Sequence, residues 1–315
     1  MKSPLSGIEK CTLLKVIDVS TIQNRWRREI GIDWLPPTNI AMVNYWLDDS
    51  TGLQFYTPAS MAGGGDLYAQ LQRYPWYYID EKWEFKVALR LLQSLPLGSR
   101  VLEIGVGQGA FLEKARGAGL QVCGMELNPV GAQAAKEKGF TIVEKDMAAL
   151  HTEDPTPWDA ICAFQVLEHL PEPRLFLDQA IALLKPGGLL ILSVPNAAVA
   201  SQLDPERNDL LDQPPHHMSH WDEGVFRSLE SFLPLKLIDV AFEPLAKYHL
   251  SWFVGSLSQR LRQQIGQCGG KLVLNRFTIP FVQKALALGL RQLVHGHTLL
   301  VCFEKSGVTP SSLQL

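Results

Sequence analysis

The 315-residue sequence lacks long apolar runs, internal repeats and a strong excess of charge. No stretch approaches the roughly 18 uninterrupted apolar residues of a membrane span. The first residues lack the apolar core of a signal peptide. A net charge of −3 argues against broad attraction to nucleic acid. We therefore expect a cytoplasmic, globular protein without a nucleic-acid partner.

The five cysteines are scattered and show no C-x-x-C spacing. This pattern lacks the paired thiolates of common zinc sites, so we expect no bound metal. Cys123, Cys162 and Cys302 lie in apolar, strand-like runs. Buried thiols in a reducing compartment are the simplest interpretation of these three residues.

The most informative feature of the sequence is a glycine-rich turn between a strand and a helix. Residues 101–104 form a short apolar run typical of a buried strand. Gly105, Gly107 and Gly109 follow, and residues 111–115 have the apolar spacing of a helix. Such a turn lets a ligand approach the backbone closely. The pattern predicts a nucleotide-like cofactor.

Two cofactor classes fit the glycines alone. Gly105-x-Gly107-x-x-Ala110, followed by Glu126, matches the fingerprint of NAD-dependent dehydrogenases. Glu103 lies inside the strand, where a buried carboxylate needs a cationic partner. The α-amino group of a methionine moiety would supply that partner, which favours S-adenosylmethionine (SAM).

Three motifs between residues 101 and 196 resemble those of class I SAM-dependent methyltransferases. They are LEIGVGQG at 102–109, VLEHL at 166–170 and LKPGG at 184–188. Residues 296–305 resemble the closing strand of that fold. The resemblance implies an α/β, Rossmann-like, doubly wound and mostly parallel seven-stranded sheet with one antiparallel strand. The ligand would lie at the carboxyl ends of the strands.

The resemblance also implies SAM as cofactor and eight positions that bind it. Glu126 would accept hydrogen bonds from both ribose hydroxyls, and Leu127 would pack on adenine. Asp146 and the Met147 amide would meet the adenine edge, and Gln165 would lie near the sulfonium. Capping of the following segment is the alternative role for Glu126 and Asp146. The full set is Glu103, Gly105, Gly107, Glu126, Leu127, Asp146, Met147 and Gln165.

Histidines after the fourth and fifth core strands are the candidate acid–base residues. His169 follows the fourth strand, and His216 and His217 lie in a Pro-Pro-His-His segment after the fifth. Both places are on the ligand side of the expected sheet. Imidazole titrates in the range that suits proton transfer. The predicted catalytic residues are His217, His216 and His169, although a single histidine more often has a structural role.

Residues 1–79 form a predicted accessory α+β unit. Apolar spacing predicts a helix over 21–30, and two strands are expected at 40–46 and 53–56. The hairpin resembles a zinc ribbon of pattern Y-x-x-C-x-x-C-G-L. Asp48 and Thr51 occupy its cysteine positions, which implies a ribbon remnant without metal.

Residues 80–306 form the predicted SAM-binding core. Asp80 is the expected N-cap of its first helix, and the aromatic residues 76–78 would either fold over SAM or join the accessory unit to the core. An insertion at 245–295 contains a predicted amphipathic helix at 279–294. That helix would pack on the core or, less readily, on a membrane surface or partner. Residues 307–315 are the expected flexible tail.

The predicted function is SAM-dependent methyl transfer to oxygen, nitrogen or carbon of a small molecule such as a sugar or secondary metabolite. An RNA or protein methyltransferase is the first alternative. It is disfavoured because residues 164–167 do not carry an Asn-Pro-Pro-Tyr-type motif. A non-catalytic SAM-binding subunit is the second alternative. The sequence does not predict an oligomeric state.

Overall fold

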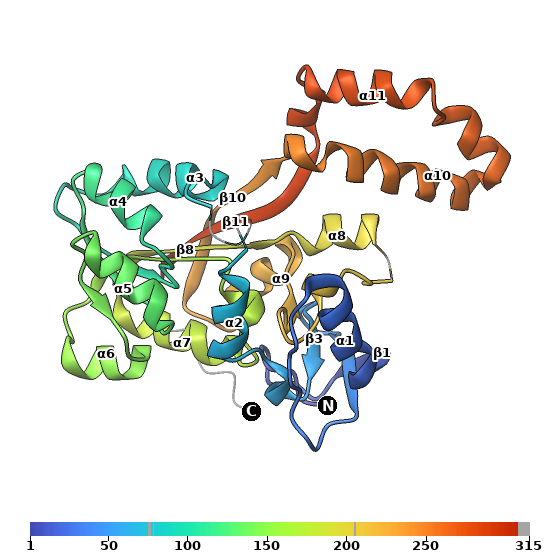
Figure 1. The fold of residues 1–315 in the computed structure, drawn as a ribbon. Helices are drawn as coiled ribbons and strands as arrows, with labels where there is room; N and C mark the ends of the chain where they lie inside the picture. Colours follow the sequence, from blue (N-terminus) through green and yellow to red (C-terminus); the bar gives the residue numbers. More distant parts are fainter. Residues whose placement is uncertain (75–76, 78, 205, 308–315) are drawn as a thin grey trace.

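The structure, a computed structural model, describes residues 1–74, 77, 79–204 and 206–307. Two sheets organise this part of the chain: a seven-stranded sheet in the core and a four-stranded sheet in the N-terminal unit (Figure 1). The predicted tail at 307–315 lies outside the described residues except for Gly307.

The core sheet has the strand order β10-β11-β8-β7-β4-β5-β6. Its pairings are parallel except for those of β11, which runs antiparallel to both β8 and β10. This arrangement confirms the predicted doubly wound sheet with one reversed strand. The strands are β4 (Arg100–Ile104), β5 (Gln121–Met125), β6 (Ile142–Val143), β7 (Trp158–Phe164), β8 (Leu184–Pro195), β10 (Leu235–Pro244) and β11 (His295–Lys305).

Alternate residues of each core strand face opposite layers of helices, as the strand period of two requires. In β4, Val101 belongs to the buried cluster that contains side chains of α3 and α4, whereas Leu102 belongs to the cluster that contains side chains of α6, α7 and α9. Glu103 shares the face of Val101 by this alternation. The helices of the core are α3 (Trp83–Leu92), α4 (Ala110–Gly117), α5 (Pro129–Glu137), α6 (Met147–Glu153), α7 (Pro173–Leu183), α8 (Ala197–Leu203) and α9 (Glu223–Ser228).

The N-termini of two core helices differ in their capping. Asp222 caps α9 by accepting a hydrogen bond from the Val225 amide at 3.0 Å. The prediction of Asp80 as the N-cap of α3 is wrong. That helix begins at Trp83, and Lys82, at the capping position, makes no side-chain capping bond. Because Asp80 lies too far before the helix, its carboxylate does not cap the first turn.

The N-terminal unit contains the expected hairpin, β2 (Met42–Asp48) and β3 (Gln54–Thr57). Two unpredicted strands flank it: β1 (Cys11–Asp18) and β9 (Ser219–His220). Since β9 pairs with β3, the segment after β8 returns to the N-terminal unit. The helices of this unit are α1 (Val19–Arg25), which continues as a π-helical turn to Ile30, and α2 (Gly65–Leu71).

Residues at the two cysteine positions of the ribbon pattern form the turn of the hairpin. Asp48 is fully buried and accepts hydrogen bonds from the hydroxyls of Ser6, Ser50 and Thr51 at 2.5–2.8 Å. Gly52 completes the turn at φ +82°. A buried carboxylate bonded to three hydroxyls stabilises the turn. That the hairpin is a ribbon remnant without metal stays a prediction.

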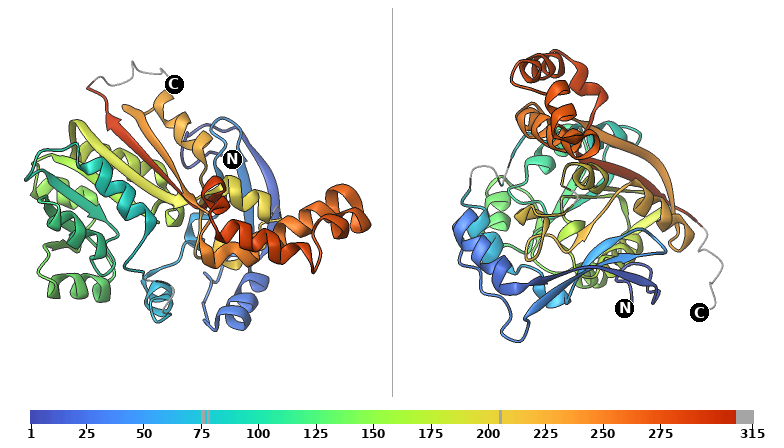
Figure 2. Two further views of the ribbon diagram at one scale, coloured as in Figure 1. Left: turned by 90° about the horizontal axis from the view of Figure 1, so that it is seen from above. Right: turned by 90° about the vertical axis from the view of Figure 1, so that its right-hand side faces the viewer.

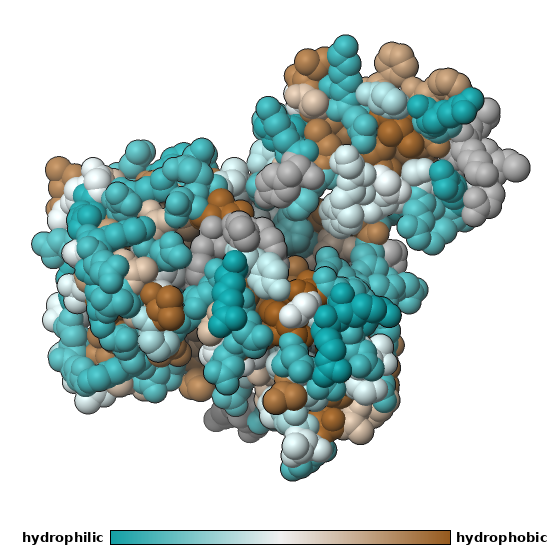
Figure 3. Space-filling view, viewed as in Figure 1, coloured by the Kyte–Doolittle hydropathy of each residue, from teal (hydrophilic) through white to brown (hydrophobic). Residues whose placement is uncertain are grey.

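Residues 250–287 form a helical arm that projects from the core (Figures 1 and 2). It consists of α10 (Leu250–Val273), kinked at Gly266, and α11 (Thr278–Ala287). Leu286 packs between the two helices, whereas Phe277 and Phe281 are exposed, and apolar patches lie on the arm (Figure 3). No helix among the described residues is long and apolar enough to cross a membrane. Surface association through 279–294 stays a prediction.

Candidate active site

The glycine-rich turn lies directly after β4, at the carboxyl end of that strand. Gly105 has φ +75°, a left-handed conformation that costs side-chain-bearing residues energy. A Cβ at Gly105 would lie only 2.7 Å from Cγ2 of Val166. Gly107 and Gly109 also have positive φ. The turn therefore requires glycine for both conformation and space.

Glu126 follows β5 and holds the glycine turn from the neighbouring strand. Its Oε2 accepts a hydrogen bond from the Gly107 amide at 2.9 Å, and its Oε1 accepts one from the Asn128 amide at 2.8 Å. Burial raises the pKa of Glu126, although these backbone bonds oppose that effect. Each carboxylate oxygen retains a further lone pair for a hydroxyl donor. This arrangement fits the predicted binding of a ribose.

Glu103 is a buried carboxyl group without a full set of partners. It is 2% exposed, and its Oε2 has no hydrogen-bond partner. Burial raises the pKa of Glu103 well above its usual value, while the positive charge of Lys82 acts in the opposite direction. An unpartnered buried carboxyl invites a cationic group. The site therefore fits a ligand that carries an ammonium group close to a ribose.

The three residues predicted at the adenine edge occupy the ends of β5 and β6. Leu127 is 69% exposed, so an apolar surface is available next to Glu126. Asp146 caps α6 by accepting a hydrogen bond from the Ala149 amide at 2.8 Å, and Met147 is buried. The capping role expected as an alternative for Asp146 is thus present in the structure. Adenine contact stays a prediction.

Gln165 ends β7 in an unusual backbone conformation. Its φ is +55°, which is uncommon for a residue with a side chain. Its amide donates to the Ser193 carbonyl at 2.9 Å, and this bond holds the end of β7 against β8. Strain of this kind gathers at functional sites. The predicted place of Gln165, beside the glycine turn and at the carboxyl edge of the sheet, fits contact with a ligand.

The three predicted catalytic histidines lie together. The ring of His169 is 4.6 Å from that of His216 and 5.0 Å from that of His217, measured between centroids. The rings of His216 and His217 are stacked at 4.5 Å. Burial lowers the pKa of His169 and of His216 to about 3 and that of His217 to about 4. At neutral pH all three imidazoles are uncharged.

Aromatic residues of the N-terminal unit cover this cluster. The rings of Trp26, Tyr68 and Tyr77 lie 6.2–6.4 Å from that of His216. Tyr68 also meets the ring of His169 edge-on at 5.6 Å. Of the predicted aromatic segment 76–78, residues 76 and 78 lie outside the described residues. The N-terminal unit thus closes the site over the carboxyl edge of the sheet.

Sequence reasoning missed the charged residues that surround the histidines. Glu168 is 2% exposed, and both of its carboxyl oxygens lack a hydrogen-bond partner. Burial raises the pKa of Glu168 to about 8. Asp212 bonds His217 at 3.2 Å and pairs with buried Arg207 at 2.8 Å. Glu168 stands within the VLEHL motif, which was the only signal available for it.

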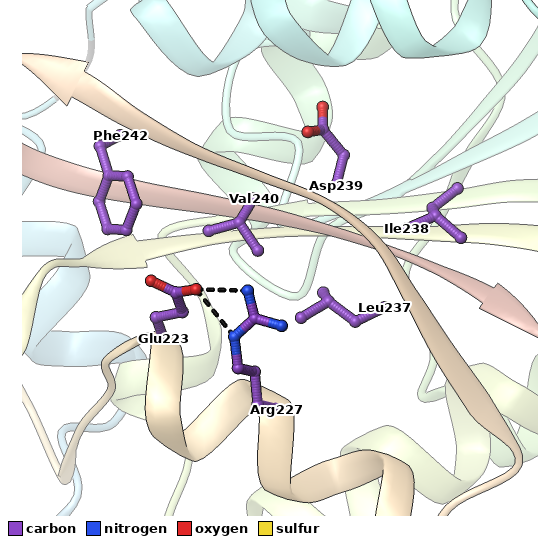
Figure 4. Close-up of a pocket in the computed structure, with 7 residues that line it drawn as sticks. All are labelled: Glu223, Arg227, Leu237, Ile238, Asp239, Val240 and Phe242. Carbon is purple, nitrogen blue, oxygen red and sulfur yellow. Dashed lines mark hydrogen bonds and ion pairs between the residues drawn. The ribbon is translucent and has the colours of Figure 1, made fainter.

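A second hollow lies at the far edge of the core sheet. It has a volume of about 330 Å³ and lies between α9 and β10. Glu223 and Arg227 pair across its rim beside Val240 (Figure 4). Three strands, β11, β8 and β7, separate β10 from β4. This hollow therefore does not belong to the glycine-rich site.

Comparisons with known proteins agree with the geometry of the site. Residues 76–230 match the family described as a methyltransferase domain. The chain is 36% identical over 116 residues to ubiquinone biosynthesis O-methyltransferase of Xylella fastidiosa, covering 35% of this chain and 47% of that protein. The homologue from Paraburkholderia phytofirmans is 33% identical over 112 residues, covering 34% of this chain and 48% of that protein. The chain thus spans about half the length of these curated relatives.

Solved structures with related folds include the N-methyltransferase NodS from Bradyrhizobium japonicum in complex with S-adenosyl-L-homocysteine. That comparison covers 70% of this chain and 85% of NodS at 17% identity, with a TM-score of 0.43. The family match includes the glycine turn, Glu126 and the VLEHL segment. Through residues 76–230 this chain belongs to the class I SAM-dependent methyltransferases, whose methyl donor is SAM.

Proposed function

We propose that this protein transfers the methyl group of SAM to a hydroxyl oxygen of a small molecule. The observation that carries the proposal is the pair of carboxyl groups beside the glycine turn, buried Glu103 and half-buried Glu126. One ligand that carries both an ammonium group and a ribose would partner the two groups. The curated relatives are named as O-methyltransferases, which supports oxygen as the acceptor atom.

The chemistry of this reaction depends on position more than on proton transfer. The sulfonium of SAM makes its methyl group electrophilic, so the protein must hold a nucleophile in line with the S–CH₃ bond. Such positioning lowers the activation barrier by about 7–11 kcal/mol. In this proposal Glu103, Glu126 and the glycine turn hold SAM, and Gln165 faces the sulfonium. The remaining task is to orient the acceptor and exclude water.

The histidine cluster supports a small acceptor. Trp26, Tyr68 and Tyr77 close over the rings, and an enclosed site suits a small molecule better than a folded macromolecule. Neutral imidazoles accept a hydrogen bond from a hydroxyl and so orient its lone pair toward the methyl group. As the O–CH₃ bond forms and the S–CH₃ bond breaks, an imidazole takes up the hydroxyl proton and S-adenosylhomocysteine leaves. We assign this role to the pair His216 and His217, with His169 beside them.

The test is a turnover assay with radiolabelled SAM and a panel of hydroxylated aromatic, sugar and amino-sugar acceptors. We expect labelled product and stoichiometric S-adenosylhomocysteine with at least one hydroxylated acceptor. His217→Ala is expected to lower the rate at least tenfold with unchanged SAM affinity, whereas His151→Gln, on the exposed face of α6, serves as the control. SAM binding without turnover of any acceptor would contradict catalysis and favour a non-catalytic subunit.

A further inference from the structure

We infer that His169, His216 and His217 bind a divalent transition-metal ion. One nitrogen from each ring lies within 4.8 Å of one from each other ring, and no other group of this kind occurs among the described residues. The sequence did not predict this site, because its ligands come from two distant segments and include no cysteine. They meet since η3 (Leu167–His169) ends beside the loop that carries the other two histidines.

The hydrogen bonds of the three rings leave a lone pair on each. His169 Nδ1 bonds the His216 carbonyl at 2.6 Å, and His216 Nδ1 bonds the Leu211 carbonyl at 2.8 Å. His217 Nδ1 bonds Asp212 Oδ1 at 3.2 Å. Carbonyl and carboxylate oxygens only accept, so each Nδ1 carries the proton and each Nε2 keeps its lone pair. Metal-binding histidines are fixed in this same way.

Two buried polar groups at the cluster also lack partners. His216 Nε2 is buried without a hydrogen bond, and so are both oxygens of Glu168. Glu168 Oε1 lies 3.9 Å from His169 Nε2. Leaving buried polar groups without partners is unfavourable. A cation between these atoms would satisfy the imidazole lone pairs and the carboxylate together.

The separations are compatible with a metal after a small movement. Zinc–nitrogen bonds of about 2.1 Å place two nitrogens of a tetrahedral ion about 3.4 Å apart. The histidine nitrogens must therefore approach one another by roughly an ångström. Three imidazoles with a neighbouring carboxylate suit zinc and other first-row divalent ions, and three protein nitrogens leave one position for a further ligand.

The ion would have a chemical use in the reaction proposed above. A divalent metal polarises a bound hydroxyl and lowers its pKa, which would activate the acceptor next to Gln165. This use rests on the proposed function. With the ion bound, the imidazoles would hold the acceptor hydroxyl through the metal and no longer by direct hydrogen bonds. Metal binding itself depends only on the histidine cluster, so the two proposals fail separately.

The experiment uses the full chain without a histidine tag, stripped with EDTA and then freed of the chelator. Calorimetric titration with Zn²⁺ is expected to give one equivalent per chain. His216→Gln and His217→Gln should each weaken binding at least tenfold, whereas His151→Gln should bind as the wild type does. Co²⁺ substitution should give the visible absorption of a nitrogen-ligated, tetrahedral ion. Circular dichroism confirms the fold of every sample.

Absence of Zn²⁺ binding by the folded wild-type chain would overturn the inference. Binding that survives unchanged in both histidine variants would overturn it as well, since the ion would then lie elsewhere. If those variants fail to fold, Glu168→Gln leaves the three rings in place and is expected to weaken Zn²⁺ binding about tenfold. Titration of the same samples with SAM separates the outcomes: SAM binding without metal refutes this inference alone, and metal binding without SAM refutes the proposed function alone.

Discussion

Glu126→Gln tests the cofactor site with a change of only one atom. In the structure both carboxylate oxygens accept a backbone hydrogen bond, from the amides of Gly107 and Asn128 at 2.9 and 2.8 Å. Glutamine must turn its NH₂ toward one of these donors and toward one ribose hydroxyl. A hydrogen bond to a charged group contributes about 1.5–3 kcal/mol. Because about 1.4 kcal/mol is a factor of ten, we expect SAM affinity to fall about 10- to 150-fold.

Isothermal titration calorimetry with SAM measures this change directly. Glu113→Gln, on the exposed face of α4, makes the same chemical substitution away from the site and should bind SAM as the wild type does. Thermal unfolding of both variants checks that the glycine turn has not collapsed. A dissociation constant of folded Glu126→Gln within twofold of the wild-type value would refute the assignment of Glu126 to the ribose.

Three further predictions follow from the geometry. Gly105→Ala should lower the unfolding free energy by at least about 1–2 kcal/mol and abolish SAM binding. The added Cβ would strain a backbone of positive φ and would lie 2.7 Å from the Val166 side chain. An unchanged melting temperature would contradict this prediction. Burial raises the pKa of Glu103, and the ammonium group of SAM favours its ionised form, so SAM binding should release a proton from Glu103. The affinity for SAM should therefore rise with pH. Calorimetry in buffers of different ionisation enthalpy measures the protons released, and Glu103→Gln should release fewer than the wild type. Burial alone would raise the pKa of Asp48, but hydroxyl hydrogen bonds lower the pKa from 3.8 to about 2. The ionised Asp48 carboxylate therefore stabilises the folded protein above about pH 4, and this stabilisation is lost as the pH falls through about 2. In denaturant unfolding the wild type should therefore exceed Asp48→Asn by about 2 kcal/mol more at pH 7 than at pH 2, with exposed Asp49→Asn as control.

Local patterns predicted the core because each signal was short-range. The apolar run before Gly105, the glycine turn and the LKPGG segment each indicate one local structure. The doubly wound sheet was implied by the family resemblance that these motifs carry. Leu102 and Val101 face opposite helical layers, as the alternation of a strand requires. The carboxyl ends of β4, β5 and β7 then meet at one edge, which brings Gly105, Glu126 and Gln165 together.

Features that depend on distant contacts could not be predicted in the same way. Strand β9 has two residues, and only its pairing with β3 makes it a strand. Aspartate is a good capping residue, so the sequence predicts a cap at Asp80, yet α3 begins at Trp83 without a side-chain cap and buries Phe85 and Val87 in the core. The VLEHL motif contains Glu168, but no local pattern predicts its burial, because burial depends on distant segments such as Met218, whose amide donates to the Glu168 carbonyl.

The most direct test of the cofactor assignment is calorimetric titration of the purified protein with SAM, S-adenosylhomocysteine and NAD⁺. The site described here predicts micromolar binding of both adenosyl ligands and no binding of NAD⁺. The affinity for both adenosyl ligands should fall in Glu126→Gln. Binding of NAD⁺ without SAM would show that the glycine turn serves a dinucleotide and would contradict the account.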